Sequence, residues 1–301
     1  MVALLVSILG IYFFVALGAF AKWRFREELH DRTLILVSVY LLQPFLTFWG
    51  LTTRPLKMEV FTLSFWYLGI VMALFFLMVP FARRLFGDKK RRAIFLVASL
   101  CGNTGNLGIP LGIAIFGDMS VPYTTMINLA NVFFVNILGV YIYSSGSFSP
   151  RQSVMNVVKM PILWSAVAAL AVNAAGWRLP ESVESVLRLG AYASIVMQLL
   201  LFGIYLSQVR VEHIEKRLVA AVGSVKFFLL PLAGWVVMRL FHFPPDATKI
   251  LLLELMTPLA IANVNFAALF KCRPKEVAAL VFVSSLFFLL YFLVLWPLIS
   301  I

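Results

Sequence analysis

Two short polar segments interrupt apolar stretches of this sequence and carry most of its potential for chemistry. Residues 101–110 read Cys-Gly-Asn-Thr-Gly-Asn-Leu-Gly-Ile-Pro, and residues 257–265 read Thr-Pro-Leu-Ala-Ile-Ala-Asn-Val-Asn. Glycine weakens a helix through its backbone entropy, and proline weakens it because proline has no backbone N–H. We therefore expect both segments to interrupt the helices in which they lie.

Unwound backbone in the middle of a helix is suited to binding an anion. Its free N–H groups and the positive end of the helix dipole attract negative charge, and Asn and Thr side chains add directional hydrogen bonds. The alternative is a packing motif in which the glycines only let neighbouring helices approach closely. The candidate binding residues are Asn103, Thr104, Asn106, Pro110, Thr257, Pro258, Asn263 and Asn265.

Other polar residues lie near the middle of further apolar runs. Gln43 and Gln198 could close a binding site with their amides, or simply join neighbouring helices. Asn128, Asn131 and Asn136 are expected to hydrogen-bond the first unwound segment. Without such partners its backbone groups would be unsatisfied in hydrocarbon.

Two ionisable residues, Glu254 and Lys226, also lie inside apolar runs. Such a charge costs about 2.5–3.5 kcal/mol on insertion scales, so each is a functional candidate. Glu254 could exchange a proton or reach the membrane interface. Lys226 could attract an anion, or extend its amine to the lipid headgroups. Lys226 lies about 12 Å deep from one face and Glu254 about 9 Å deep from the other. In a core about 30 Å thick this leaves about 9 Å between them, so we expect no direct ion pair.

The composition indicates which elements must position these residues. Hydrophobic residues make up 62% of the 301 residues and charged residues 13%, against roughly 25% charged in soluble domains. This composition excludes a soluble enzyme. The net charge of +12 would suit a nucleic-acid partner, but the chain lacks the polar surface for one. The bilayer is the expected partner.

A bilayer-spanning helix takes about 20 mostly apolar residues, and ten runs qualify or nearly so. They are residues 2–21, 33–51, 61–82, 93–117, 119–144, 160–177, 189–209, 218–238, 250–270 and 277–301. Eighteen Lys and Arg residues fall in the odd-numbered loops and six in the even-numbered loops. The positive-inside rule then places the odd loops in the cytoplasm and both termini outside it, in a multi-pass protein of the inner (plasma) membrane.

Ten spans divide into two sets of five, residues 1–150 and 151–301. Because five is odd, the second set must cross the membrane in the opposite sense to the first. The fourth and ninth spans carry the two polar segments, at corresponding positions of the two halves. Paired interrupted spans of this kind mark substrate sites in transporters built from inverted repeats. We predict an all-α membrane protein of ten helices in two inverted five-helix repeats.

The motifs resemble those of the auxin efflux carrier family. The run Gly-Asn-Thr-Gly-Asn-Leu-Gly-Ile-Pro-Leu from residue 102 is similar to that family's signature, and Gly117 follows at the usual distance. The ninth-span segment with Arg273-Pro274, and the second-span stretch around Pro44, are similar to further family motifs. Thr257-Pro258 keeps only one proline of the family's usual pair, and Asn265 stands where an apolar residue is common.

The resemblance implies a secondary transporter of small organic anions, such as an auxin-like acid or a mono- or dicarboxylate. It implies that the fourth and ninth spans cross. It also implies a scaffold of spans 1, 2, 6 and 7, which often forms a homodimer, and a moving transport domain of spans 3–5 and 8–10. Asn103, Pro110, Pro258 and Asn263 match the family's crossover positions.

Two alternatives remain at this stage: a sodium-coupled symporter like the related bile-acid carriers, and a membrane sensor that has lost transport. We expect no enzyme, since no metalloprotease, P-loop or nucleophile-elbow motif is present. No cofactor is implied. The three histidines lie in or beside loops without metal-ligand spacing, so we predict no metal site.

Overall fold

The computed structural model describes residues 2–144, 151, 155, 158–209 and 215–299. Within these ranges the chain is helical, with one isolated β-bridge and no strand. Among the described residues, six helical segments are long and apolar enough to cross a membrane: Asp31–Thr52, Met58–Leu85, Thr104–Tyr143, Glu181–Ser207, Lys216–Leu240 and Pro274–Val294.

Large apolar side chains on the outside of the helices have the distribution expected in lipid. Leu9, Phe65, Leu189 and Leu290 are each exposed by 65% or more. A soluble protein rarely leaves so many exposed, whereas hydrocarbon accepts them. The protein is therefore an all-α integral membrane protein, as the composition predicts. The ten-span count and the inverted repeat stay predictions, and the expected repeat boundary at residue 150 lies outside the described residues.

The chain forms two compact units. Unit 1 comprises Met1–Phe61, Gly105–Met126 and Asn156–Gln208, and unit 2 comprises Thr62–Thr104, Ile127–Met155 and Val209–Ile301. Unit 1 thus contains four of the predicted spans (the first, second, sixth and seventh) together with parts of the fourth and fifth. The helices that begin in unit 1 are α1 (Val2–Phe25), α2 (Asp31–Leu36), α3 (Gln43–Thr52), α4 (Met58–Leu85), α6 (Ile109–Phe116), α7 (Val121–Phe133), α10 (Pro161–Ala174) and α11 (Glu181–Ser207).

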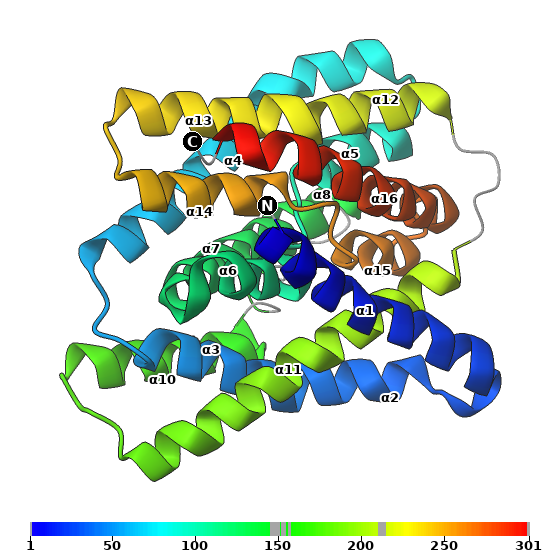
Figure 1. Ribbon diagram of the computed structural model, residues 1–301. Helices are drawn as coiled ribbons and strands as arrows, with labels where there is room; N and C mark the ends of the chain where they lie inside the picture. Colours follow the sequence, from blue (N-terminus) through cyan, green and yellow to red (C-terminus); the bar gives the residue numbers. More distant parts are fainter. Residues whose placement is uncertain (1, 145–150, 152–154, 156–157, 210–214, 300–301) are drawn as a thin grey trace. The chain divides into compact units, whose positions relative to one another are not determined.

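In unit 1, α1 crosses α11 at close range, and α3 contacts both α10 and α11 (Figure 1). Two glycines allow the crossing. A Cβ added at Gly18 would lie 2.0 Å from the carbonyl oxygen of Leu200, and one at Gly203 would lie 1.8 Å from that of Val15. Small residues commonly allow such contact between membrane helices.

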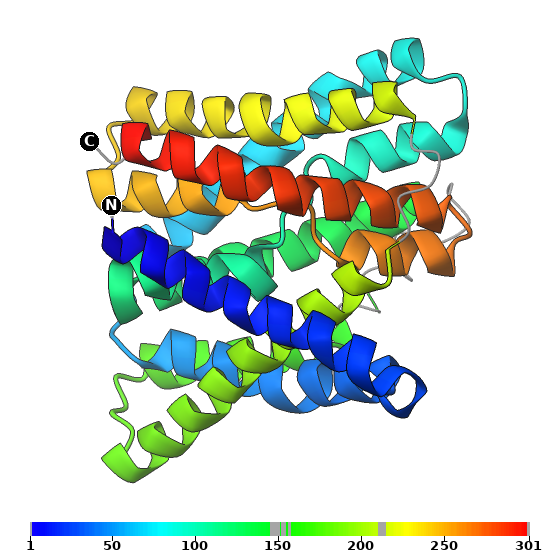
Figure 2. The same ribbon diagram turned by 45° about the vertical axis from the view of Figure 1, so that its right-hand side comes forward.

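Most of α4 belongs to unit 2, where α12 and α13 continue one another through a π-helical turn at Val225–Leu229. α13 packs on α14, α15 on α16, and α12 on α5. In Figure 2, α16 (red) runs roughly along the direction of α12 and α13 (yellow). The helices that begin in this unit are α5 (Lys89–Ala98), α8 (Val140–Tyr143), α12 (Lys216–Ser224), α13 (Leu230–Leu240), α14 (Pro245–Met256), α15 (Ala262–Leu269) and α16 (Pro274–Ile299).

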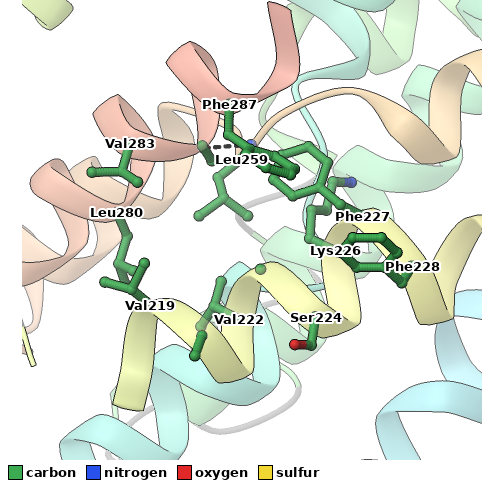
Figure 3. Close-up of a pocket in the computed structure, with 13 residues that line it drawn as sticks. Val219, Val222, Ser224, Lys226, Phe227, Phe228, Leu259, Leu280, Val283 and Phe287 are labelled. Atoms are coloured by element: carbon green, nitrogen blue, oxygen red, sulfur yellow. Dashed lines mark hydrogen bonds between the residues drawn. The ribbon is translucent and has the colours of Figure 1, made fainter. Parts of the chain in front are cut away.

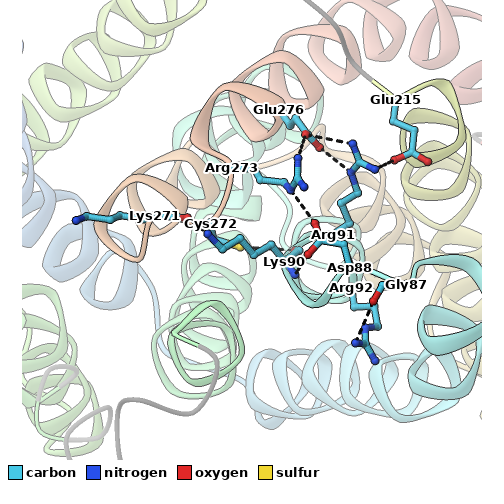
Figure 4. A network of polar contacts seen from close by, with 10 residues as sticks. All are labelled: Gly87, Asp88, Lys90, Arg91, Arg92, Glu215, Lys271, Cys272, Arg273 and Glu276. Atoms are coloured by element: carbon cyan, nitrogen blue, oxygen red, sulfur yellow. Dashed lines mark hydrogen bonds and ion pairs between the residues drawn. The ribbon is translucent and has the colours of Figure 1, made fainter.

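An ion cluster joins the starts of α5, α12 and α16 in unit 2 (Figure 4). Arg273 pairs with Asp88 at 2.8 Å and with Glu276 at 2.6 Å. Arg91 pairs with Glu276 at 3.3 Å and with Glu215 at 2.6 Å. Because each arginine bridges two carboxylates, the cluster fixes three helix ends together.

Asp88 also caps α5 by accepting a hydrogen bond from the Lys90 N–H at 3.1 Å. Partial burial acts to raise the pKa of Asp88, but the Lys90 N–H and the Arg273 guanidinium outweigh it. The pKa of Asp88 therefore lies below its ordinary value. This carboxylate stabilises the fold only when it is ionised.

The close approach of α1 and α11 can be tested by the same Gly→Ala substitution at two positions. Gly203→Ala should lower the melting temperature of the purified protein, because its Cβ would overlap the Val15 carbonyl; overpacking costs about 1–3 kcal/mol or more. Gly10→Ala on α1 is the control, since its added Cβ would meet nothing within 4 Å. Equal melting temperatures for the two variants would contradict the close approach of α1 and α11.

The ion cluster predicts a pH dependence for Asp88→Asn. A lowered native pKa means that the ionised Asp88 contributes its full stabilisation above the unfolded-state pKa of about 3.9. That contribution is lost as pH falls from there through the native pKa. The melting temperature of Asp88→Asn should therefore lie below that of the wild type at neutral pH, with the gap closing below about pH 4. The difference in melting temperature between Arg273→Gln and the wild type should depend on pH in the same way. A difference that does not change with pH would contradict the ion pair between Asp88 and Arg273.

Candidate functional site

Both polar segments singled out in the sequence lie where helices are interrupted. α5 ends at Ala98, and a π-helical turn at Thr104–Gly108 precedes α6. α14 ends at Met256, and helix resumes only with α15 at Ala262. The non-helical segments 101–103 and 257–261 both belong to unit 2, and we call them the crossover.

The two segments of the crossover pair with each other through their backbones. Gly102 and Leu259 form an antiparallel bridge. The Asn103 N–H donates to the Pro258 carbonyl at 2.8 Å, and the Ala260 N–H donates to the Cys101 carbonyl at 3.0 Å. Each interrupted helix thus supplies hydrogen-bond partners for backbone groups that the other leaves unpaired. Backbone N–H and C=O groups that water cannot reach must find such partners within the protein.

Asn131 on α7 holds the first segment. Its Nδ2 donates to the Gly102 carbonyl at 2.9 Å and to the Thr104 hydroxyl at 3.1 Å, and its Oδ1 accepts from the Tyr67 hydroxyl at 3.2 Å. The Thr104 hydroxyl in turn donates to Asn128 at 2.9 Å. Among the three asparagines expected to secure this backbone, Asn131 does so and Asn128 bonds a side chain instead.

Asn136 differs from its expected role. Its Nδ2 donates to the carbonyl of Val132 in its own helix at 2.9 Å. A π-helical turn at Phe134–Gly139 begins between Asn131 and Asn136. The Nδ2 bond of Asn136 therefore stays within its own helix and does not hold the first segment.

Asn263 and Ser284 hold the second segment. The Asn263 amide donates to the Ala260 carbonyl at 3.0 Å and accepts from the Tyr143 hydroxyl at 3.2 Å. The Leu259 N–H donates to the Ser284 hydroxyl at 3.2 Å. Both polar atoms of the Asn263 side chain therefore have partners within unit 2, and its role in binding a ligand stays a prediction.

Buried polar groups that have no partner lie at the crossover and in the helices beside it. Lys226 and Glu254 are fully buried, and neither the ammonium nor either carboxylate oxygen has a hydrogen-bond partner. Asn103 is 3% exposed, and its side-chain Nδ2 likewise has no partner. As expected, Lys226 and Glu254 form no ion pair with each other, but neither side chain reaches the surface. In a native protein such unpartnered groups need an explanation.

Gly102 allows the Lys226 ammonium to approach the crossover. A Cβ added at Gly102 would lie 2.8 Å from the Lys226 Nζ and 2.6 Å from the Thr257 hydroxyl. Thr257 donates to the Glu254 carbonyl at 2.7 Å and so closes the end of α14. A side chain at position 102 would displace the ammonium or the threonine.

The remaining predicted binding residues are divided between the units. In unit 2, Pro258 is buried and Asn265 is exposed on α15. In unit 1, Asn106 and Gln43 are half-buried, and Pro110 is buried in the first turn of α6. Gln198, also in unit 1, is buried and donates to Ser194 in its own helix at 2.9 Å.

Sequence reasoning missed three residues that position the crossover, namely Tyr67, Tyr143 and Ser284. Each is a hydroxyl in an apolar helix. A hydroxyl in a membrane span usually bonds to a neighbouring helix, so the sequence indicates that these residues are candidates. The sequence does not indicate which group each hydroxyl contacts.

Comparison with known proteins places the chain in a family. A family model described as membrane transport protein matches residues 3–156 and 147–296, which is most of the chain. The chain belongs to this family. The membrane transport protein family includes the auxin efflux carriers, so the resemblance seen in the motifs is confirmed. The chain is also 23% identical over 302 residues to an uncharacterised transporter of Methanocaldococcus jannaschii, across 96% of each sequence.

The two asparagines of α7 and its continuation give a matched test of the crossover. Asn131→Ala would leave the Gly102 carbonyl and the Tyr67 hydroxyl without their partner, and each such loss costs about 1–3 kcal/mol. Asn136→Ala removes one bond within its own helix and should cost less. We expect a clearly lower melting temperature for Asn131→Ala. The same loss in both variants would show that Asn131 has no special role at the crossover.

Proposed function

We propose that this membrane transport protein is a secondary carrier that moves a small organic anion by alternating access, with the crossover as its binding site. The observation that carries the proposal is the set of unpartnered donors there. Asn103 Nδ2 and Lys226 Nζ are both buried in unit 2 without a hydrogen-bond acceptor. An anion with several acceptor oxygens would satisfy both.

A carboxylate has the chemistry that these donors require. It accepts several hydrogen bonds, and charge-assisted bonds to an ammonium are about twice as strong as neutral ones. The apolar side chains around the crossover, such as Leu259 and Met256, suit the carbon skeleton of an organic acid better than an inorganic ion. We therefore favour a mono- or dicarboxylate or an aromatic acid as the substrate.

Glu254 would couple transport to protons. Its two oxygens have no partner in the same buried region. An ionised Glu254 would oppose a second carboxylate nearby, whereas a protonated Glu254 would not and could donate a hydrogen bond. Substrate binding would then favour proton uptake at Glu254, which couples transport of the substrate to transport of a proton.

Alternating access requires two parts that move against each other. The two compact units are suitable candidates, because the chain passes between them at the Thr104–Gly105 bond, immediately after the crossover. In this proposal ten spans form two inverted repeats, with both termini outside the cytoplasm. The unit that holds the crossover would be the moving one.

Sodium coupling is the competing mechanism. A sodium site would need oxygen ligands near the crossover, and the two unpartnered Glu254 oxygens could serve as such. A Cβ added at Gly102, however, would lie 2.8 Å from the Lys226 Nζ and 3.5 Å from the Glu254 carbonyl oxygen, so an ammonium already lies beside this backbone. A fixed positive charge at this place disfavours a second cation, so we propose that transport does not depend on sodium.

The transport assay should use the carboxylate that most raises the melting temperature of the purified protein, chosen from mono- and dicarboxylates and indole acids. In proteoliposomes, Asn103→Ala and Lys226→Met should each lower the rate of uptake at least tenfold, since a hydrogen bond to a charged group contributes about 1.5–3 kcal/mol. Asn136→Ala is the control and should retain most activity. Wild-type rates in both crossover variants would refute the site.

The coupling ion is tested in the same vesicles. Replacing sodium by choline at fixed pH should leave wild-type uptake unchanged. Glu254→Gln should abolish the dependence of uptake on an imposed pH gradient. Uptake that stops without sodium would show instead that the carrier is a sodium symporter.

A further inference from the structure

A cavity of about 270 Å³ opens between α12 with its π-helical turn and α16, all within unit 2 (Figure 3). Its walls are almost entirely apolar. For comparison, an apolar cavity of about 150 Å³ stays dry and binds benzene. The side chains that define the walls are Val219, Val222, Phe227, Leu280, Val283 and Phe287.

The rim of this cavity faces outward from the helices. Phe228 and Phe287, which both line it, are 60% and 42% exposed. α12 and α16 belong to segments that are apolar enough to cross a membrane. The medium outside the rim is therefore lipid hydrocarbon, which enters an apolar cavity without the cost of desolvating polar groups.

The length of the cavity matches one leaflet. Its lining on α12 and the π-helical turn extends from Val219 to Phe228, which is about 14 Å at 1.5 Å per residue. Half of a hydrocarbon core about 30 Å thick is about 15 Å. A single acyl chain that enters from one surface would therefore extend along the whole cavity.

Basic residues stand at the end where such a lipid would place its headgroup. α12 and α16 begin at the same side of unit 2 (Figures 1 and 2). Lys216 and Arg217 are exposed in the first turn of α12, one turn before Val219, and Lys275 is exposed in the first turn of α16. Basic residues near a membrane surface attract anionic lipids.

We propose that this cavity binds one acyl chain of an anionic phospholipid, whose phosphate lies against Lys216, Arg217 and Lys275. The site adjoins the crossover, because Leu259 and the side chain of Lys226 both contribute to its lining. The bound chain supports Leu259, the residue that bridges to Gly102. An anionic lipid thus becomes a structural partner of the crossover, whatever substrate the protein carries.

The test compares phosphatidylglycerol with phosphatidylcholine on delipidated protein, with lipid binding measured by native mass spectrometry. The wild type should prefer phosphatidylglycerol. Lys216→Gln with Arg217→Gln should weaken phosphatidylglycerol binding about fivefold for each charge removed. The matched control is Arg83→Gln with Arg84→Gln, which removes two exposed charges from the end of α4, a helix that contributes no residue to the cavity lining, and should have little effect. Equal losses in the two pairs would overturn the proposal.

The cavity itself is tested by filling it. Val283→Trp should weaken the binding of both lipids, whereas Leu290→Trp, at a site 70% exposed on the same helix, should not. A phosphatidylglycerol with a photoactivatable diazirine in mid-chain gives an independent measurement on wild-type protein. It should label Leu280 and Val283 more strongly than Leu290. Stronger labelling of Leu290 would show that the chain covers the outer surface and does not enter the cavity.

Discussion

Backbone groups inside a membrane must find partners within the protein, and the rest of this structure depends on how the crossover meets that requirement. Two helices stop in mid-course, which leaves N–H and C=O groups that water cannot reach. The Asn103–Pro258 and Ala260–Cys101 hydrogen bonds satisfy part of this demand. The side chains of Asn131, Asn263 and Ser284 satisfy more of it from neighbouring helices. An arrangement with so many reciprocal contacts has little freedom, so it can hold a binding site in a fixed geometry.

The crossover also explains why charged groups can exist at this depth. Lys226 and Glu254 are fully buried, and each would be costly in plain hydrocarbon. Gly102 has no side chain, so the ammonium can reach the polar backbone of the bridge. The unpartnered donors that remain after all these contacts are the part of the structure that a transported anion would complete. The lipid cavity on the other side of Leu259 would support the same bridge from the membrane.

The sequence predicted where the helices are interrupted, because glycine and proline act locally on the backbone. It could not show which residues repair the interruptions. Asn131 and Asn136 lie in the same apolar run, but only Asn131 bonds the crossover backbone, whereas Asn136 bonds within its own helix. The depth of Lys226 in the sequence is compatible with an amine at the headgroups, yet Lys226 lies in a π-helical turn with its side chain fully buried. Such turns depend on tertiary packing, so apolar periodicity did not reveal them. The unpartnered state of Asn103 is also a tertiary property, visible only once its neighbours are placed.

The central claim is that an organic anion binds to Asn103 and Lys226 at the crossover. Equilibrium binding in detergent tests it most directly, because binding does not depend on coupling or on the movement of the units. The titrated ligand is the carboxylate that most stabilises the wild type, and the double variant Asn103→Ala with Lys226→Met is compared with Asn136→Ala. We predict that the affinity falls at least a hundredfold in the double variant and stays near the wild-type value in Asn136→Ala, since two bonds to a charged ligand are worth about 3–6 kcal/mol together. An unchanged affinity in the double variant would contradict the account.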